Sequence, residues 1–196
     1  MNKLFQEAKN ALNNHQVIAF PTETVFGLGV FYDDEKAYNL LNQVKRRRED
    51  KPYTMMLSKV EEIFEYAEVD NRYLKLIKKY MPGSLTILVK SKPSVPSYVT
   101  HGTGIIGIRI PSNKEALELL EFVKKPLLVP SANRRDEKPA LTSQEVKDIF
   151  QDEIKVVVPG KTSLGQPSTI VDLTGQEIKL IRKGPISLEE LNLAIS

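Results

Sequence analysis

The stretch IIGIRIPSNKEALELLEFVKKPLLV, residues 105–129, contains the pattern that decides the fold class. Its opening residues are apolar apart from Gly107 and Arg109, which is typical of a buried strand. Apolar residues then recur at helical spacing over 114–123, and Leu127–Val129 forms a second short apolar run. A strand, a helix and a strand in succession favour an α/β fold.

The same alternation continues on both sides of this stretch. Apolar runs predict further strands over 17–20, 53–57, 85–89, 156–158, 168–173 and 178–181, the last two joined by an antiparallel hairpin turn. Apolar spacing and capping patterns predict further helices over 3–14 and 35–45 and from Ser58, Asp70, Thr142 and Ser187 onward. Ser58, Thr142 and Ser187 each precede a glutamate by three residues, which is the capping-box pattern. We therefore expect one domain over residues 1–196, with a mixed sheet that helices cover on both faces.

The composition excludes several kinds of chemistry. The chain has no cysteine, which excludes disulfides, zinc–thiolate sites, iron–sulfur clusters and a cysteine nucleophile. It has two histidines, His15 and His101, so a three-histidine metal site is excluded as well. The net charge of +3 is only a mild excess of cations. No apolar run approaches the roughly 18 residues of a membrane span, and the N-terminus has no signal-peptide pattern, so we expect a cytoplasmic protein without a membrane partner.

Two polar loops follow predicted strands, where ligand sites gather in α/β folds. Thr22 and Thr24 come directly after the first strand, and their hydroxyls could bind a small polar ligand or cap a turn. Ser131 and Asn133 follow the strand at 127–129 and lie on one side of an extended segment. Alone, the Thr22 and Thr24 pair favours a capped turn, whereas the Ser131 and Asn133 pair fits a turn and a binding site equally.

Cations are concentrated in residues 45–48, at the end of a predicted helix. Such a cluster complements the helix dipole as a solvated face, or it binds phosphate, because arginine offers a bidentate fork and lysine a point charge. Lys45 and Arg47 point to the same side if the segment is extended. Arg109 lies among apolar strand residues and therefore needs an anionic partner, which is either an acidic side chain or a bound ligand.

Seven motifs follow one another along the chain: P-T-E-T-V-F-G-L-G (21–29), K-x-R (45–47), M-P-G-S-L-T (81–86), G-I-R-I-P (107–111), P-S-A-N (130–133), P-S-T-I-V-D (167–172) and R-x-G (182–184). In this order and spacing they resemble the YrdC/TsaC family, whose members are threonylcarbamoyl-AMP synthases. The resemblance covers nearly the whole chain. It implies a twisted mixed sheet with helices on both faces, around a concave, positively charged groove.

The resemblance also implies an activity and its partners. The expected reaction joins L-threonine, bicarbonate or CO2, and ATP into L-threonylcarbamoyladenylate and pyrophosphate, for the threonylcarbamoyladenosine modification of tRNA. Mg2+ is expected to arrive with ATP, with no dedicated metal ligands on the protein. The expected partners are the downstream threonylcarbamoyl transferase machinery and, through the basic groove, RNA.

Residues that match the family's motifs receive roles from the same resemblance. The catalytic set is Lys45, Arg47, Ser131 and Asn133. The threonine-binding set is Thr22, Thr24, Arg109 and Ser168. The ATP-binding set is Arg47, Asn133, Thr142 and Arg182. In this hypothesis the cations neutralise carboxylate and phosphate charges, and the polar side chains fix orientation.

The chain departs from the family pattern at three places. Many members have Asn-Pro-Leu where this chain has Lys51-Pro52-Tyr53, and a histidine where it has Met56. The segment Arg134–Lys138 is a residue longer than its counterpart.

The expected chemistry agrees with the composition. A carbamate formed from threonine and CO2 supplies the attacking oxygen, so the protein needs no activated cysteine, serine or histidine. One alternative is an RNA-binding module of the same fold without nucleotidyl transfer, in which the clusters 45–48 and 134–135 line a groove for an RNA backbone. Another is a carbamoyltransferase related by fold, as in hydrogenase maturation.

Overall fold

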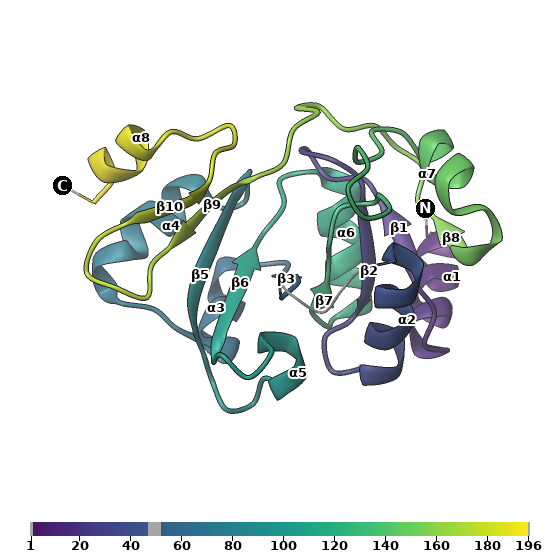
Figure 1. Cartoon of the computed structure of the whole chain (residues 1–196), viewed down its shortest axis with the longest axis horizontal. Coiled ribbons are helices and arrows are strands. Elements are labelled where there is room, and N and C mark those ends of the chain that lie inside the picture. The colour runs from purple at the N-terminus through teal and green to yellow at the C-terminus, as the bar shows by residue number, and fades with distance from the viewer. Residues whose placement is uncertain (1, 47–51, 196) are drawn as a thin grey trace.

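The computed structural model describes residues 2–46 and 52–195. Ten strands within these ranges form one mixed sheet in the order β10-β9-β5-β6-β3-β7-β2-β1-β8, and β4 also pairs with β5. Their bounds are β1 Ile18–Phe20, β2 Gly27–Phe31, β3 Thr54–Met56, β4 Ala67–Glu68, β5 Leu85–Ser91, β6 Ile105–Arg109, β7 Leu127–Leu128, β8 Val156–Val157, β9 Thr169–Asp172 and β10 Lys179–Arg182. Figure 1 shows β3 and β7 near the middle of the molecule, with the remaining strands divided between two halves.

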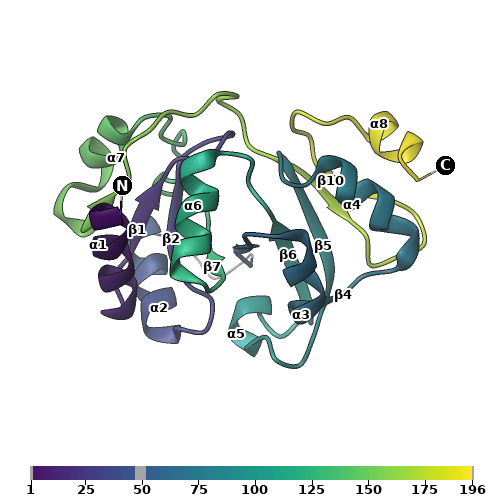
Figure 2. The same ribbon diagram turned by 180° about the vertical axis from the view of Figure 1, so that it is seen from behind.

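The helices lie against both faces of this sheet. Their bounds are α1 Asn2–Asn13, α2 Glu35–Lys45, α3 Ile63–Tyr66, α4 Leu74–Tyr80, α5 Ser97–Thr100, α6 Lys114–Val123, α7 Ser143–Phe150 and α8 Leu188–Leu193. Helix α2 lies on the near side of β2 in Figure 1, whereas α1 and α6 lie on the near side in Figure 2. The predicted α/β class, mixed sheet and double coverage are therefore confirmed.

Two apolar clusters occupy the two faces. One combines α1 and α6 with side chains such as Ile18, Phe20 and Leu127, whereas the other takes the intervening residues Ala19 and Leu128 together with α2 and α7. Neighbouring residues of one strand enter different clusters because successive side chains point to opposite faces. This is why the strands read as continuous apolar runs without polar alternation.

Capping residues set the ends of the helix that carries the basic cluster. The Asp34 side chain accepts a hydrogen bond from the backbone N–H of Ala37 at 3.0 Å and begins α2. Helix α2 ends at Lys45 because Arg46 adopts a left-handed conformation with φ of 51°. Lys45 is therefore the last residue of a helix and belongs to no extended segment.

The sequence patterns predicted some capping boxes wrongly and missed some helices and strands. The expected capping box between Ser58 and Glu61 does not form, because the Ser58 hydroxyl binds the carboxylate of Glu62 at 2.5 Å instead. Half of the box expected at Thr142 is confirmed, because the Thr142 hydroxyl accepts from the backbone N–H of Glu145. The reciprocal bond is shifted by one residue, since the Glu145 carboxylate accepts from the backbone N–H of Leu141. The Ser187–Glu190 box is confirmed, as is the antiparallel β9–β10 hairpin. Strand β4 and helix α5 were not predicted.

Gly184 allows the loop after β10 to pass against the start of β9. A Cβ at position 184 would lie 2.3 Å from the backbone nitrogen of Thr169 and 2.5 Å from the carbonyl carbon of Ser168. Both are backbone atoms, so they move only if the strand moves. A Cβ at Gly175, in the hairpin turn, would meet no atom within 4 Å.

We therefore expect Gly184→Ala to lower the free energy of unfolding by about 1–3 kcal/mol, the usual effect of overpacking. Gly175→Ala is the matched control and should unfold at or slightly above the wild-type temperature. Thermal unfolding followed by circular dichroism measures both. Equal melting temperatures for Gly184→Ala and the control would contradict the close approach.

Candidate functional site

A cavity of about 230 Å³ lies over the middle of the sheet. Thr54 and Met56, on the central strand β3, point to the same face and form part of its floor. Five segments that are distant in sequence contribute the polar lining that the sequence predicts: Thr22, Thr24, Arg109, Ser131, Ser168 and Arg182. The strand order brings them together, because Thr22, Thr24 and Ser131 come from the β7-β2-β1 side of β3 and the others from the β6-β5-β9-β10 side.

Thr22 and Thr24, in the loop after β1, make different hydrogen bonds. The Thr22 hydroxyl donates to the carbonyl of Val25 at 2.7 Å and accepts from the backbone N–H groups of Thr24 and Val25. Because its single proton is used there, the 2.8 Å contact between the two hydroxyls has Thr24 as donor. The Thr24 oxygen can then still accept a hydrogen bond through its lone pairs. Thr22 stabilises the turn, whereas Thr24 is a buried residue of the cavity lining whose oxygen keeps its acceptor capacity.

Arg109 has its anionic partner inside the protein. Its Nη2 lies 2.6 Å from Oε1 of Glu23, and its Nε donates to the carbonyl of Gly83 at 3.2 Å. The other oxygen of Glu23 accepts from the backbone N–H of Ser112 at 3.1 Å. Burial lowers the pKa of Arg109, and the charge of Glu23 opposes that shift. The guanidinium is thus held in one orientation at the cavity wall.

Arg182 is held beside Ser168, on the same side of β3 as Arg109. Its Nε and Nη2 donate to the Ser168 carbonyl at 3.0 and 2.9 Å, and Nη2 reaches the Ser168 hydroxyl at 3.1 Å. That hydroxyl also lies 2.8 Å from Oγ1 of Thr86. Desolvation lowers the pKa of Arg182, and the nearby charge of Arg109 lowers it further. Two guanidiniums therefore line this side of the cavity.

Arg109 and Arg182 are the charged residues that line the cavity in the part of the chain that the structure describes. Arg182 was expected in the ATP set, whereas the structure couples it to Ser168 of the threonine set. Glu23 and Thr86 were not predicted. Glu23 could have been found from the sequence, because a buried arginine needs an acid and Glu23 lies between the two motif threonines.

Lys45 joins Ser131 and Asn133 from behind the cavity wall. Its Nζ is buried and donates to the carbonyl oxygens of Ser131 at 2.6 Å and Asn133 at 2.8 Å, with Oδ1 of Asn133 at 3.3 Å. The Ser131 hydroxyl donates to the same Oδ1 at 2.6 Å. Three of the four predicted catalytic residues therefore form one cluster, of which Ser131 reaches the cavity. The fourth, Arg47, lies outside the described residues.

Thr142 lies away from the cavity lining. Its hydroxyl caps α7 by accepting from the backbone N–H of Glu145 at 3.2 Å, and its backbone pairs with Lys161. The predicted ATP contact of Thr142 is thus not brought to the cavity by this structure and stays a prediction.

Two cations of the predicted RNA-binding clusters are buried in the part of the chain that the structure describes. Arg134 is buried against Glu153, and Lys45 is buried on backbone carbonyls. Of the pair 134–135, Arg135 is the exposed one, so a continuous basic groove through these clusters stays a prediction. Within residues 2–46 and 52–195 no group of three or more acidic or histidine side chains is placed to hold a metal ion. No helix in the same ranges is long and apolar enough to cross a membrane.

Comparisons with known proteins agree with the motif resemblance. The family model Sua5_yciO_yrdC, described as "Telomere recombination", matches residues 10–184. A threonylcarbamoyl-AMP synthase of Pyrococcus abyssi is 32% identical over 190 residues, which are 96% of this chain and 56% of that protein. The chain thus spans about half the length of that relative. A threonylcarbamoyl-AMP synthase of an Enterobacter species is 33% identical over 177 residues, 88% of this chain and 93% of that protein.

Solved structures show the same fold. P. abyssi Sua5 complexed with L-threonine superposes with a TM-score of 0.93 at 31% identity, over 97% of this chain and 57% of that one. Escherichia coli YciO gives 0.89 at 26% identity, over 97% of this chain and 94% of that one. The predicted fold class is therefore confirmed by relatives as well as by the topology.

The Glu23–Arg109 pair provides a stability test. Glu23→Ala leaves a buried guanidinium without its partner, so we expect the free energy of unfolding to fall by about 3–5 kcal/mol. The control is Glu118→Ala, which removes an exposed partner of Lys114 and should cost less than about 1 kcal/mol. Chemical denaturation measures both variants.

The double variant Glu23→Ala/Arg109→Met should regain part of the loss, because no unpaired charge stays buried. A Glu23→Ala protein as stable as Glu118→Ala would show that the pair does not hold this wall.

Proposed function

Because the chain belongs to the Sua5/YciO/YrdC family, we propose that it is a threonylcarbamoyl-AMP synthase. As such it is a nucleotidyltransferase that converts L-threonine, bicarbonate or CO2, and ATP into L-threonylcarbamoyladenylate and pyrophosphate. The observation that carries the proposal is the cavity in which Arg109, Arg182, Thr24 and Ser168 converge. Relatives named threonylcarbamoyl-AMP synthase, and a relative solved with L-threonine, support it.

The cavity suits the two ends of a small amino acid. Its carboxylate would lie against the guanidiniums of Arg109 and Arg182, whose mutual repulsion an anion relieves. Its amine needs an acceptor, which the Thr24 oxygen provides. The apolar part of the substrate would contact Met56 and the neighbouring apolar lining. Thr22 would then act indirectly, through the turn that holds Thr24.

ATP would bind beside this amino acid, next to the cluster of Ser131, Asn133 and Lys45. Mg2+ would come with the triphosphate and stay on phosphate oxygens and water, because no acidic side chain of the described residues lines the cavity. Arg47 and Thr142 complete the proposed nucleotide contacts, and Arg182 would serve both the threonine carboxylate and the nucleotide. The ion supplies charge neutralisation of the phosphates.

In the proposed reaction the neutral amine of threonine adds to CO2 and gives up one proton to water, which forms a carbamate. A carbamate oxygen attacks the α-phosphorus of ATP, and the bond from that phosphorus to the bridging oxygen breaks, which releases pyrophosphate. The protein orients the reactants and neutralises charge, so it needs no nucleophile of its own. Arg109 and Arg47 would serve this purpose directly, and Lys45 would serve it from behind the wall, next to the Ser131 and Asn133 cluster that it holds.

The product would pass to a threonylcarbamoyl transferase that modifies tRNA, and we place the protein in the cytoplasm. RNA binding without nucleotidyl transfer is less well supported, because the cations that it invokes at Lys45 and Arg134 are buried.

Pyrophosphate release tests the proposed activity. With ATP and bicarbonate, release should depend on L-threonine and fall when threonine is omitted or replaced by serine. Lys45→Ala and Arg47→Ala should each lower kcat by about 100-fold or more, because each removes a charge that stabilises the transition state. Lys75→Ala, at an exposed position on α4, is the control for a lost lysine. Full activity in both the Lys45 and the Arg47 variants would contradict the assignment.

A second test distinguishes the proposed roles of Thr22 and Thr24. Thr24→Val removes the acceptor for the substrate amine and should raise KM for L-threonine about tenfold, as expected for a hydrogen bond to a charged group. Thr22→Val removes the acceptor of two backbone N–H groups, so it should mainly lower the melting temperature. Steady-state kinetics and thermal unfolding of both variants decide between these roles. An unchanged KM in Thr24→Val would refute the amine contact.

A further inference from the structure

Arg134 is buried in a position that the proposed reaction does not use. Arg134 is 8% exposed, and its guanidinium lies 4.9 Å from the ring centre of Phe150. Nη1 and Nη2 donate to the two carboxylate oxygens of Glu153, and Nη2 also reaches the carbonyl of Ile149 at 3.3 Å. The side chain is therefore fixed against the end of α7 and the 3₁₀ turn that follows.

The same guanidinium also holds the end of α2. Helix C-termini leave four carbonyl groups without partners. In α2 the backbone N–H of Arg46 serves the first two of these, those of Asn42 and Gln43. Nη1 of Arg134 donates to the third, on Val44, and the backbone N–H of Arg135 donates to the fourth, on Lys45, at 3.0 Å. A cation here also complements the helix dipole.

Two ties therefore join the same two segments. From α2, the Lys45 ammonium reaches the carbonyls of Ser131 and Asn133. From the loop, Arg134 and the amide that follows it reach the end of α2. Asn133 closes the loop, because its Nδ2 donates to the carbonyl of Arg134 at 2.7 Å and to that of Glu137 at 3.0 Å. Loss of the Arg134 side chain would leave the Lys45 ammonium and the backbone N–H of Arg135 to restrain the helix end.

We propose that Arg134, together with Glu153, is a positioning residue that fixes the end of α2 against the loop 131–138 and so holds the Lys45 ammonium on Ser131 and Asn133. The expected effect of Arg134 on turnover rests on the proposed function, whereas its expected effect on the position of Lys45 does not. The pair is ionised at neutral pH, because the guanidinium lowers the pKa of Glu153. The fork of arginine is required, since its two Nη groups serve the helix and the carboxylate at once.

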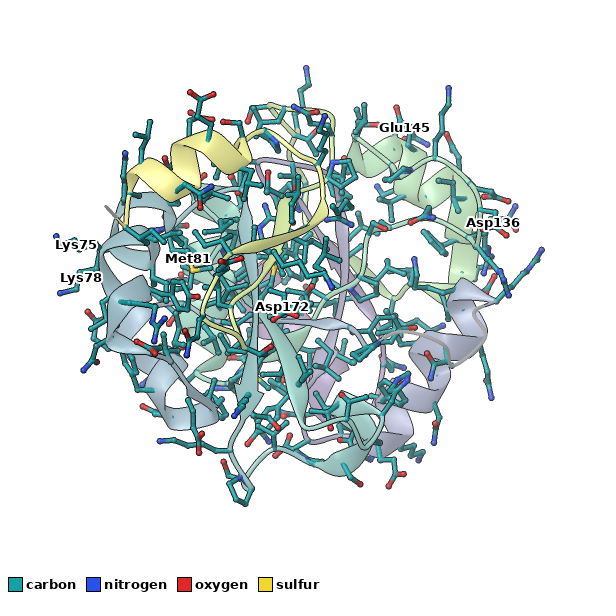
Figure 3. The ribbon with its side chains drawn as sticks, turned by 60° about the vertical axis from the view of Figure 1, so that its left-hand side comes forward. Lys75, Lys78, Met81, Asp136, Glu145 and Asp172 are labelled. Atoms are coloured by element: carbon teal, nitrogen blue, oxygen red, sulfur yellow. The ribbon has the colours of Figure 1, made fainter. Side chains whose placement is uncertain are left out.

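Acylation of lysines by an amine-reactive ester, read by mass spectrometry, measures the state of Lys45 directly. In Arg134→Met we expect Lys45 to react about tenfold faster than in the wild type, because a buried, hydrogen-bonded ammonium must be released before it reacts. Lys75 and Lys78, which point outward from α4 in Figure 3, are internal references and should not change.

Arg135→Met is the matched control. The Arg135 side chain is exposed and binds the exposed Asp136, labelled at the edge of Figure 3, while its backbone N–H is kept in the variant. Lys45 should react there as in the wild type. Equal reactivity of Lys45 in folded Arg134→Met and Arg135→Met would overturn the proposal.

Two further variants test the proposal if Arg134→Met does not fold. Arg134→Lys keeps the charge but not the fork, and Glu153→Gln keeps the shape but not the charge, so both should raise the reactivity of Lys45. Wild-type reactivity in both would also overturn the proposal.

Kinetics separate positioning from general destabilisation. If the wild type releases pyrophosphate, Arg134→Met should lower kcat about tenfold or more with KM for L-threonine nearly unchanged, because misplacement affects the reacting geometry and the threonine contacts lie elsewhere. Absence of pyrophosphate release in the wild type would refute the proposed function alone, since the acylation result would still decide the role of Arg134.

Discussion

The buried ion pair between Arg109 and Glu23 is the constraint on which the cavity depends. Glu23 lies in the loop between β1 and β2, and Arg109 ends β6, so the pair spans the centre of the sheet. Removing two charges from water is costly unless each finds its partner and further hydrogen bonds. Here Gly83, Ser112 and the opposing charge supply them. Any arrangement of the two halves that separates the pair is therefore strongly disfavoured.

The same glutamate also binds the segment that precedes β9. Its backbone carbonyl accepts from the backbone N–H groups of Ser163 and Leu164 and from the Ser163 hydroxyl. This segment leads to Ser168 and thus to the carbonyl that holds Arg182. Three parts of the cavity wall are thus positioned through one residue of the P-T-E-T motif. The cations that face the cavity are oriented by the fold before a ligand arrives, which is the condition for electrostatic catalysis.

Local rules were sufficient wherever neighbours in sequence decide the structure. The helix predicted over 114–123 has those bounds, because Asn113 caps its start and Lys124 ends it with a left-handed residue. They failed at Ser58, where Glu62 offered a better-placed carboxylate than the Glu61 of the pattern. They were silent on β2, whose Gly27 and Gly29 give little strand signal. Close packing requires them, since a Cβ at either position would lie less than 3 Å from a neighbouring side chain.

The sequence by itself determined the α/β class, most of the helices and strands, the excluded chemistries and the motif residues that are candidates for ligand binding. Only the tertiary structure decided which acid pairs with Arg109, which threonine hydroxyl keeps an acceptor for the cavity, and that Arg182 joins Ser168. It also decided that Lys45 and Arg134 are buried, although both lie in basic clusters that look solvated. The physical reason is that periodicity and capping act between neighbours, whereas the partner of a buried charge is set by segments that meet only in the folded chain.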